Sequence, residues 1–271
     1  MTLIQATILG IVQGLTEFLP ISSSAHLVIT PMLFQWSIPE QQAFIFDVIV
    51  QVGTLVAVIL YFWRDLLAIL QASFQGLIQQ HPFASPQARL GWLILLASLP
   101  AGILGLLFKD QVEEAFSNPL MAGIFLLITA ALLMAGERLG KRTRPLDQLT
   151  WRDALWIGLF QAASIFPGIS RSGSTISGGM LKSFDRPSAA RFSFLMSIPI
   201  MLAAGLLALK DLAGAADLSS QIAPLLIGFA TAAIVGYLSI RWLLAYLARR
   251  SFYIFVIYCL ILGVVTIIFS L

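Results

Sequence analysis

Two polar segments in an otherwise apolar chain carry the side chains that could do chemistry. In the first, residues 13–26 (QGLTEFLPISSSAH), Gln13 and Glu17 are four positions apart and therefore project from the same face of a helix. Three serines and His26 follow Pro20. Carboxylates, hydroxyls and imidazoles can activate a nucleophile or move a proton, so this segment predicts catalytic residues.

The second segment, residues 161–175 (QAASIFPGISRSGST), is typical of an oxyanion site. Its glycines let the backbone approach a ligand, and free N–H groups at the start of the following helix attract an anion. An arginine fork suits phosphate oxygens, although the P-loop spacing is absent. We predict that phosphate is bound by hydroxyls and one guanidinium, namely those of Ser22, Ser170, Arg171, Ser172 and Thr175.

The two segments are copies of one another. A shift of 148 positions superposes seven identical residues within the nineteen positions from 6 to 24: Ala6 on Ala154, Gly10 on Gly158, Gln13 on Gln161, Phe18 on Phe166, Ile21 on Ile169, Ser22 on Ser170 and Ser24 on Ser172. Polar groups in hydrocarbon are costly and usually functional, so a repeated polar segment indicates one site built from two halves.

Composition defines the elements that must position these residues. With 59% apolar and 11% charged residues and a mean hydropathy of +0.92, the chain is predicted to be an all-α integral membrane protein. No basic stripe supports a nucleic-acid partner, and the N-terminus lacks the features of a cleaved signal. The single cysteine, Cys259, excludes an internal disulfide. Six apolar runs are long enough to span a bilayer: 43–62, 90–108, 120–136, 192–209, 222–244 and 252–271.

The two polar segments are too short and too broken to span. Each begins as an apolar helix, meets a proline that ends it (Pro20 or Pro167), and resumes as a second short helix. We expect two re-entrant helical hairpins; the alternative is a Pro-kinked spanning helix in each case. Three spans separate the hairpins, so the second copy enters from the opposite face. The prediction is one membrane domain, 1–271, with repeat one at about 1–140 and an inverted repeat two at about 150–271.

Positive charge gathers on one side of this topology. With the N-terminus outside, external segments hold only Lys109 and Lys210. Cytoplasmic segments hold the remaining basic residues apart from Arg171: Arg64, Arg89, Arg138, Lys141, Arg142, Arg144, Arg152, Lys182, Arg186, Arg191, Arg241, Arg249 and Arg250. The positive-inside rule therefore predicts that the first hairpin dips in from outside and that the site opens there.

The chain resembles a known family. The segments QGLTEFLPISSSAH and PGISRSGST, with Phe46-Asp47 and Gln51-x-Gly53-x-Leu55 between them, are similar to the signature motifs of the bacterial undecaprenyl-diphosphatases, also called bacitracin-resistance proteins. This resemblance implies inverted repeats with re-entrant helices in the bacterial inner membrane. It also implies hydrolysis of undecaprenyl diphosphate to undecaprenyl phosphate and inorganic phosphate, which recycles the lipid carrier of cell-wall synthesis.

The sequence departs from the family pattern at two places. Gln13 stands where many members carry glutamate. A glutamine is a poor base, so Glu17 becomes the main candidate for that role. Ser24-Ala25 replaces the Thr-Gly often found before the histidine.

The resemblance and the residues together suggest a mechanism. Glu17, helped by Gln13, would hold Mg²⁺ or Ca²⁺, unless Glu17 only pairs with an arginine. Ser23 would attack the terminal phosphorus after activation by His26 or Glu17, and Arg171 would bind the phosphates. Attack by His26 or by a metal-bound water is the alternative.

Other classes of protein remain open at this stage. Inverted repeats with broken helices are also typical of transporters, so a flippase of an anionic prenyl-phosphate lipid is the main rival. An intramembrane serine protease fits less well, because Arg171 would have no part in it. The sequence leaves a homodimer open.

Overall fold

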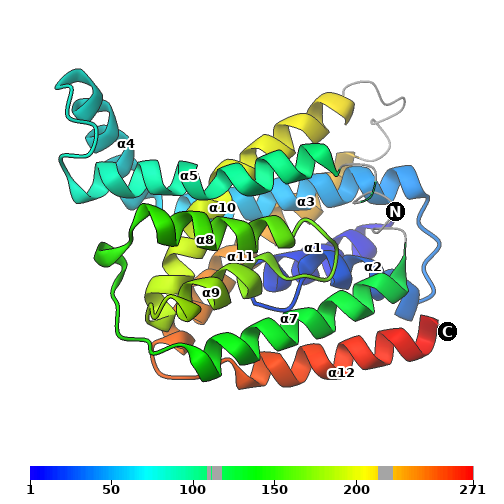
Figure 1. Cartoon of the computed structure of the whole chain (residues 1–271). Coiled ribbons are helices and arrows are strands. Elements are labelled where there is room, and N and C mark those ends of the chain that lie inside the picture. The colour runs from blue at the N-terminus through cyan, green and yellow to red at the C-terminus, as the bar shows by residue number, and fades with distance from the viewer. Residues whose placement is uncertain (109–110, 112–117, 213–221, 271) are drawn as a thin grey trace.

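Six long apolar helices form the frame of the molecule (Figure 1). The computed structural model describes residues 1–108, 111, 118–212 and 222–270, so Lys109 and Leu271 lie outside the described part. Within it, every long apolar helix matches a predicted span: α3 (Glu40–Tyr61), α5 (Pro86–Leu107), α7 (Pro119–Leu139), α10 (Arg186–Leu212), α11 (Ile222–Leu247) and α12 (Tyr253–Ser270). The prediction of an all-α membrane protein is confirmed.

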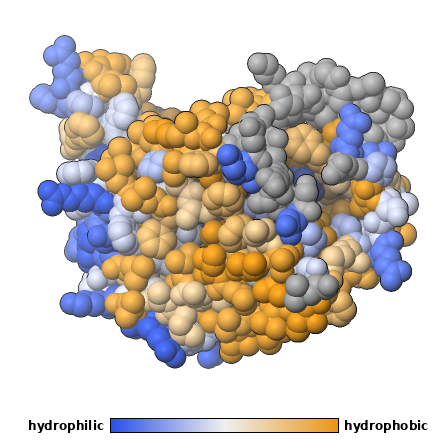
Figure 2. Space-filling model, turned by 45° about the vertical axis from the view of Figure 1, so that its right-hand side comes forward, coloured by the Kyte–Doolittle hydropathy of each residue, from blue (hydrophilic) through white to orange (hydrophobic). Residues whose placement is uncertain are grey.

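The surface agrees with a bilayer environment. Figure 2 shows a broad apolar band between two edges that carry most of the hydrophilic side chains. Large apolar side chains of α11 and α12, such as Leu226, Ile234 and Ile261, are more than 60% exposed. A water-soluble protein does not expose apolar area on this scale, whereas lipid accepts it.

One end of the bundle is held together by arginines. The buried carboxylate of Glu137, at the end of α7, pairs with Arg142 and Arg186 and accepts a hydrogen bond from Phe252 N. The last turn of α7 therefore lies beside the starts of α10 and α12. Arg191 of α10 pairs with Asp65 of α4 (Trp63–Ile78) at 2.6 Å, which places the end of α3 there as well. We call this the arginine-rich end.

The second polar segment is a re-entrant hairpin of α8 (Trp151–Ala163) and α9 (Arg171–Leu181). Arg144 donates both to Asp153, in the first turn of α8, and to Lys182 O, just past α9. The two ends of the hairpin thus meet at the arginine-rich end. A single kinked helix would put them on opposite faces, so that alternative is wrong here.

The first polar segment forms the matching hairpin from α1 (Leu3–Thr16) and α2 (Ser23–Leu33). The terminal amine of Met1 donates to Gln42 Oε1, in the first turn of α3, at 3.0 Å. The chain leaving α2 also leads directly into α3, so both ends of this hairpin lie opposite the arginine-rich end. At about 21 Å, α1 is too short to cross about 30 Å of hydrocarbon. The hairpins enter from opposite faces, as predicted.

Small residues let the first hairpin lie deep in the bundle. Helix α11 is packed between α1 and α3. A Cβ added at Gly14 would lie 2.8 Å from Gly236 N, and one added at Gly10 would lie 2.8 Å from Gly228 O. The backbones of α1 and α11 therefore approach more closely than any larger residue would permit, which fixes where the tip of the hairpin ends.

Candidate active site

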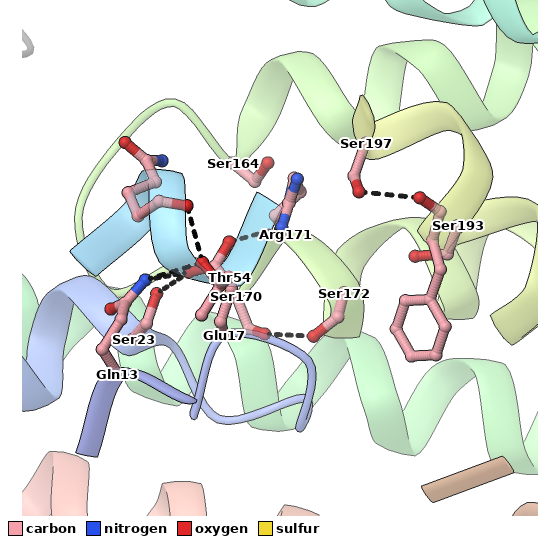
Figure 3. A network of polar contacts seen from close by, with 12 residues as sticks. Gln13, Glu17, Ser23, Thr54, Ser164, Ser170, Arg171, Ser172, Ser193 and Ser197 are labelled. Atoms are coloured by element: carbon pink, nitrogen blue, oxygen red, sulfur yellow. Dashed lines mark hydrogen bonds and ion pairs between the residues drawn. The ribbon is translucent and has the colours of Figure 1, made fainter. Parts of the chain in front are cut away.

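Glu17 stands at the centre of the polar network where the two hairpin tips meet (Figure 3). Its Oε1 accepts from Arg171 Nη2 at 2.5 Å, and its Oε2 accepts from Ser23 Oγ at 2.6 Å and from Gln13 Nε2 at 2.9 Å. Gln13 Nε2 is also 3.5 Å from Thr54 Oγ1 of α3. The predicted carboxylate, hydroxyl and guanidinium thus come together across 154 positions of sequence. Such a buried charge is tolerated because Arg171 compensates it.

A strained turn presents Ser23 to this carboxylate. Pro20 ends the first helical leg, and Ser22 adopts φ 69°, ψ 100° at the N-cap of α2. A positive φ costs a residue with a Cβ free energy and persists only where the surroundings fix it. Here the Ser22 carbonyl accepts from His26 Nδ1 at 2.7 Å, and its hydroxyl lies 3.1 Å from Ser24 Oγ.

The tip of the second hairpin depends on Gly168. This residue has φ 101°, and an added Cβ would lie 2.6 Å from Ala122 O. Thr129 of α7 fixes the turn: its hydroxyl donates to Gly168 O at 2.9 Å and accepts from Ser170 N at 2.8 Å. Gly168 N donates to Ser24 Oγ at 3.3 Å, which joins the two tips directly.

A cavity of about 260 Å³ opens at the junction. From the predicted site it is lined by Glu17, Ser22, Ser23, Ser170 and Arg171. An apolar wall completes it on the side of α5 and α10, formed by Ala101, Ile200, Met201 and Ala204. A polar centre beside an apolar wall suits a ligand with a charged head and a hydrocarbon tail.

Two predicted phosphate ligands point away from the cavity. The hydroxyl of Ser172 donates to Leu19 O at 3.0 Å. The hydroxyl of Thr175 contacts Arg171 O and Ser193 Oγ of α10, at 2.7 and 2.6 Å. Both residues are at most 2% exposed; Ser172 ties α9 to the turn of the first hairpin, and Thr175 ties α9 to α10. Their predicted contact with phosphate stays a prediction.

His26 also does not line the cavity. Its Nδ1–H donates to Ser22 O, and in the neutral ring Nε2 accepts from Tyr258 of α12 at 2.6 Å. The two rings stack with centroids 5.6 Å apart. Both ring nitrogens are therefore engaged on the far side of α2. The geometry favours Glu17 over His26 as the base for Ser23.

Three further polar residues line the cavity that the sequence did not single out as ligands: Gln51, Gln161 and Ser164. Gln161 is the residue that the 148-position shift superposes on Gln13. The internal repeat was therefore the feature of the sequence from which Gln161 could have been identified as a cavity residue.

The oxygen atoms of Gln13 and Glu17 suit a hard cation only if oxygens of a substrate complete its coordination. Among the described residues, no cluster of three or more His, Cys, Asp or Glu side chains could hold a metal alone. However, Gln13 Oε1 is buried beside Glu17 and finds no hydrogen-bond partner in the described part of the chain. An amide oxygen and a carboxylate, completed by phosphate oxygens, match the way Mg²⁺ is usually held.

The fold and site define a polytopic helical membrane protein with a polar cavity that has one apolar wall. Comparison with known proteins agrees. Residues 6–265 match the family model described as bacitracin resistance protein BacA, and the chain belongs to that family.

Curated relatives are similar over nearly their whole length. A protein from Thermomicrobium roseum is 44% identical over 96% of this chain and 95% of its own, and one from Chloroherpeton thalassium is 42% identical over 97% and 95%. A protein from Methanosphaera stadtmanae is 41% identical over 99% and 98%. All three carry the name undecaprenyl-diphosphatase.

Proposed function

We propose that the protein hydrolyses undecaprenyl diphosphate to undecaprenyl phosphate and inorganic phosphate. The family and the names of its relatives support this activity. The observation that carries it is the hydrogen bond of 2.6 Å between Ser23 Oγ and Glu17 Oε2 inside the cavity. A hydroxyl that donates to a carboxylate, which an arginine holds in place, is the arrangement of an activated nucleophile.

The first half-reaction transfers the terminal phosphoryl group to the protein. Ser23 Oγ attacks the terminal phosphorus while Glu17 takes the hydroxyl proton. The new O–P bond replaces the anhydride P–O bond, whose electron pair leaves on undecaprenyl phosphate. Water then attacks the phosphoserine and the P–O bond to Ser23 breaks, so that inorganic phosphate leaves while Glu17 returns its proton to the serine oxygen.

Arg171 stabilises the charge that develops. Its Nη2 holds Glu17, while Nη1 is buried and finds no hydrogen-bond partner among the described residues. A phosphate oxygen would satisfy this group, and its position at the start of α9 adds the favourable end of the helix dipole. Because donors fixed in advance act most strongly on charge in a dry site, this contact lowers the barrier.

A divalent cation fits the same site. Gln13 and Glu17 would hold Mg²⁺ or Ca²⁺ together with oxygens of the diphosphate. Such a cation would neutralise phosphate charge and polarise the anhydride.

The positive-inside prediction places the mouth of the cavity on the outer side of the bacterial inner membrane. The lipid tail would then remain in the bilayer while the diphosphate enters. In this setting the activity recycles the carrier lipid of cell-wall synthesis. The homodimer left open by the sequence stays a prediction.

Phosphate release by purified protein in detergent tests the proposal against the flippase alternative. Hydrolysis needs no compartments, whereas transport does. The expected result is inorganic phosphate from a prenyl diphosphate with wild-type protein and none with Ser23→Ala. Binding of the lipid by the wild type without phosphate release would favour the flippase instead.

A further inference from the structure

Gln161 has a buried amide with unused hydrogen-bonding capacity. The residue is 2% exposed, yet neither Nε2 nor Oε1 finds a hydrogen-bond partner among the described residues. Leaving such a group unsatisfied in a protein interior costs stability. The side chain nevertheless lines the cavity that holds Glu17, Ser23 and Arg171.

The internal repeat explains why this amide is free. In the first hairpin, Gln13 Nε2 donates to Glu17, one helical turn further on. In the second hairpin the residue one turn beyond Gln161 is Ile165, which also lines the cavity. The two copies thus keep the glutamine, but only the first keeps its carboxylate partner. The second glutamine lines the cavity, and no described residue accepts a hydrogen bond from its amide N–H groups.

The packing of α8 indicates which part of a ligand this amide meets. Helix α8, which carries Gln161, packs extensively on α5. A Cβ added at Gly158, one turn before Gln161, would lie 2.5 Å from Ala97 O of α5. Ala101, one turn further along α5, belongs to the apolar wall of the cavity. Gln161 therefore stands on the side where a hydrocarbon tail would leave, away from Ser23 and Gln13 on the first hairpin.

We propose that Gln161 is a substrate-binding residue whose amide N–H donates to the phosphate that stays on the lipid. This inference rests on the proposed function and assigns the two phosphates of the substrate to different sides of the cavity. The first hairpin acts on the terminal phosphate, and Gln161 holds the phosphate next to the prenyl chain. Such a contact also retains the monophosphate product, whereas inorganic phosphate gains nothing from it.

Direct binding measurements test this division. Dissociation constants for farnesyl monophosphate and for inorganic phosphate would be measured in detergent for the wild type and for Gln161→Met, which keeps the shape but lacks the amide. We expect the variant to bind farnesyl monophosphate about tenfold or more weakly, as for the loss of a hydrogen bond to a charged group. Binding of inorganic phosphate should be unchanged. Equal farnesyl monophosphate binding by both proteins would overturn the assignment.

Stability separates this role from a structural one. Because the amide has no hydrogen-bond partner in the described part of the fold, Gln161→Met should unfold at the wild-type temperature or above it. Ser177→Ala is the matched control, since Ser177 Oγ is also buried without a partner among the described residues but lies outside the cavity. It should keep wild-type activity and binding. A lower unfolding temperature for Gln161→Met, with both ligands weakened alike, would show that Gln161 supports the fold rather than the lipid phosphate.

These readouts do not depend on turnover. If the wild type released no phosphate from a prenyl diphosphate, the hydrolysis proposal would fail on that result alone. The ratio of the two dissociation constants would still decide whether Gln161 recognises a lipid phosphate.

Discussion

Ser23 and Arg171 bind the two oxygens of one carboxylate although they come from hairpins that enter the bundle from opposite faces. Ser23 Oγ lies 2.6 Å from Glu17 Oε2, and Arg171 Nη2 lies 2.5 Å from Glu17 Oε1. The 148-position shift superposes Ser23 on Arg171, so the repeat has placed a hydroxyl and a guanidinium at equivalent positions. The copies share a scaffold and have divided the chemistry.

Removing the charge of Glu17 should abolish catalysis without removing the substrate site. Glu17→Gln keeps the shape of the side chain but cannot take the proton of Ser23. We expect kcat to fall at least about a hundredfold, the usual contribution of a general base, with a smaller change in KM. Steady-state phosphate release measures both. Wild-type kcat in Glu17→Gln would contradict the role of this carboxylate.

Loss of Arg171 should cost stability as well as activity. Arg171→Ala leaves the buried Glu17 carboxylate uncompensated, which typically costs about 3–5 kcal/mol. The double variant Glu17→Gln with Arg171→Met removes both charges and should regain most of that stability while staying inactive. Thermal unfolding in detergent distinguishes the variants. Equal destabilisation of the single and double variants would show that the ion pair does not hold the two tips together.

His26 is expected to support the turn rather than transfer protons. An asparagine at position 26 can donate an N–H to Ser22 O as His26 Nδ1 does. Only the neutral hydrogen bond to Tyr258 is lost, which costs about 1 kcal/mol. His26→Asn should therefore retain activity within about tenfold and keep the shape of the pH profile. His26→Ala should lose more, since the Ser22 carbonyl then loses its side-chain donor and keeps only the longer bond of 3.4 Å from the backbone N–H of residue 26. If His26→Asn were as inactive as Ser23→Ala, the predicted acid–base role of His26 would be favoured.

Much of this arrangement could be predicted from the sequence, because hydropathy and proline positions determine it. Span lengths, the two broken helices and their opposite entry follow from burial of backbone polar groups in lipid, which allows few alternatives. Charge balance required a positive partner for Glu17 but left open whether that partner was a metal ion or an arginine. These features depend on composition over many residues rather than on a single rotamer.

The direction of each hydroxyl could not be predicted. Ser172 and Thr175 follow Arg171 closely in sequence, but the rotation of α9 turns Ser172 toward the turn of the first hairpin and Thr175 toward α10. His26 was expected near Glu17, yet its ring stacks on Tyr258, more than 230 positions away. Which face of a short helix meets the cavity depends on tertiary packing that periodicity does not encode.

Gly168 should tolerate no side chain. Gly168→Ala would place a Cβ 2.6 Å from Ala122 O at φ 101°, so we expect a loss of more than about 1 kcal/mol in the free energy of unfolding. Gly105→Ala is the matched control, because nothing lies within 4 Å of an added Cβ there. That change should leave the unfolding temperature unchanged or raise it. An equal effect of both substitutions would argue against the tip geometry described above.

A metal requirement should respond to Gln13. Chelation is expected to stop phosphate release, and Gln13→Glu should lower the Mg²⁺ concentration needed for half-maximal activity, because it adds a second carboxylate beside Glu17. A titration of activity against Mg²⁺ measures this shift. Full activity in the presence of a chelator would contradict the proposal that the site uses a divalent cation.

The most direct test of the account is a quenched single turnover with a prenyl diphosphate labelled in its terminal phosphate. The prediction is a transient label on the wild-type protein, located in the peptide that contains Ser23 and absent from Ser23→Ala. Complete conversion of substrate with no label on the protein at any time would contradict a serine nucleophile.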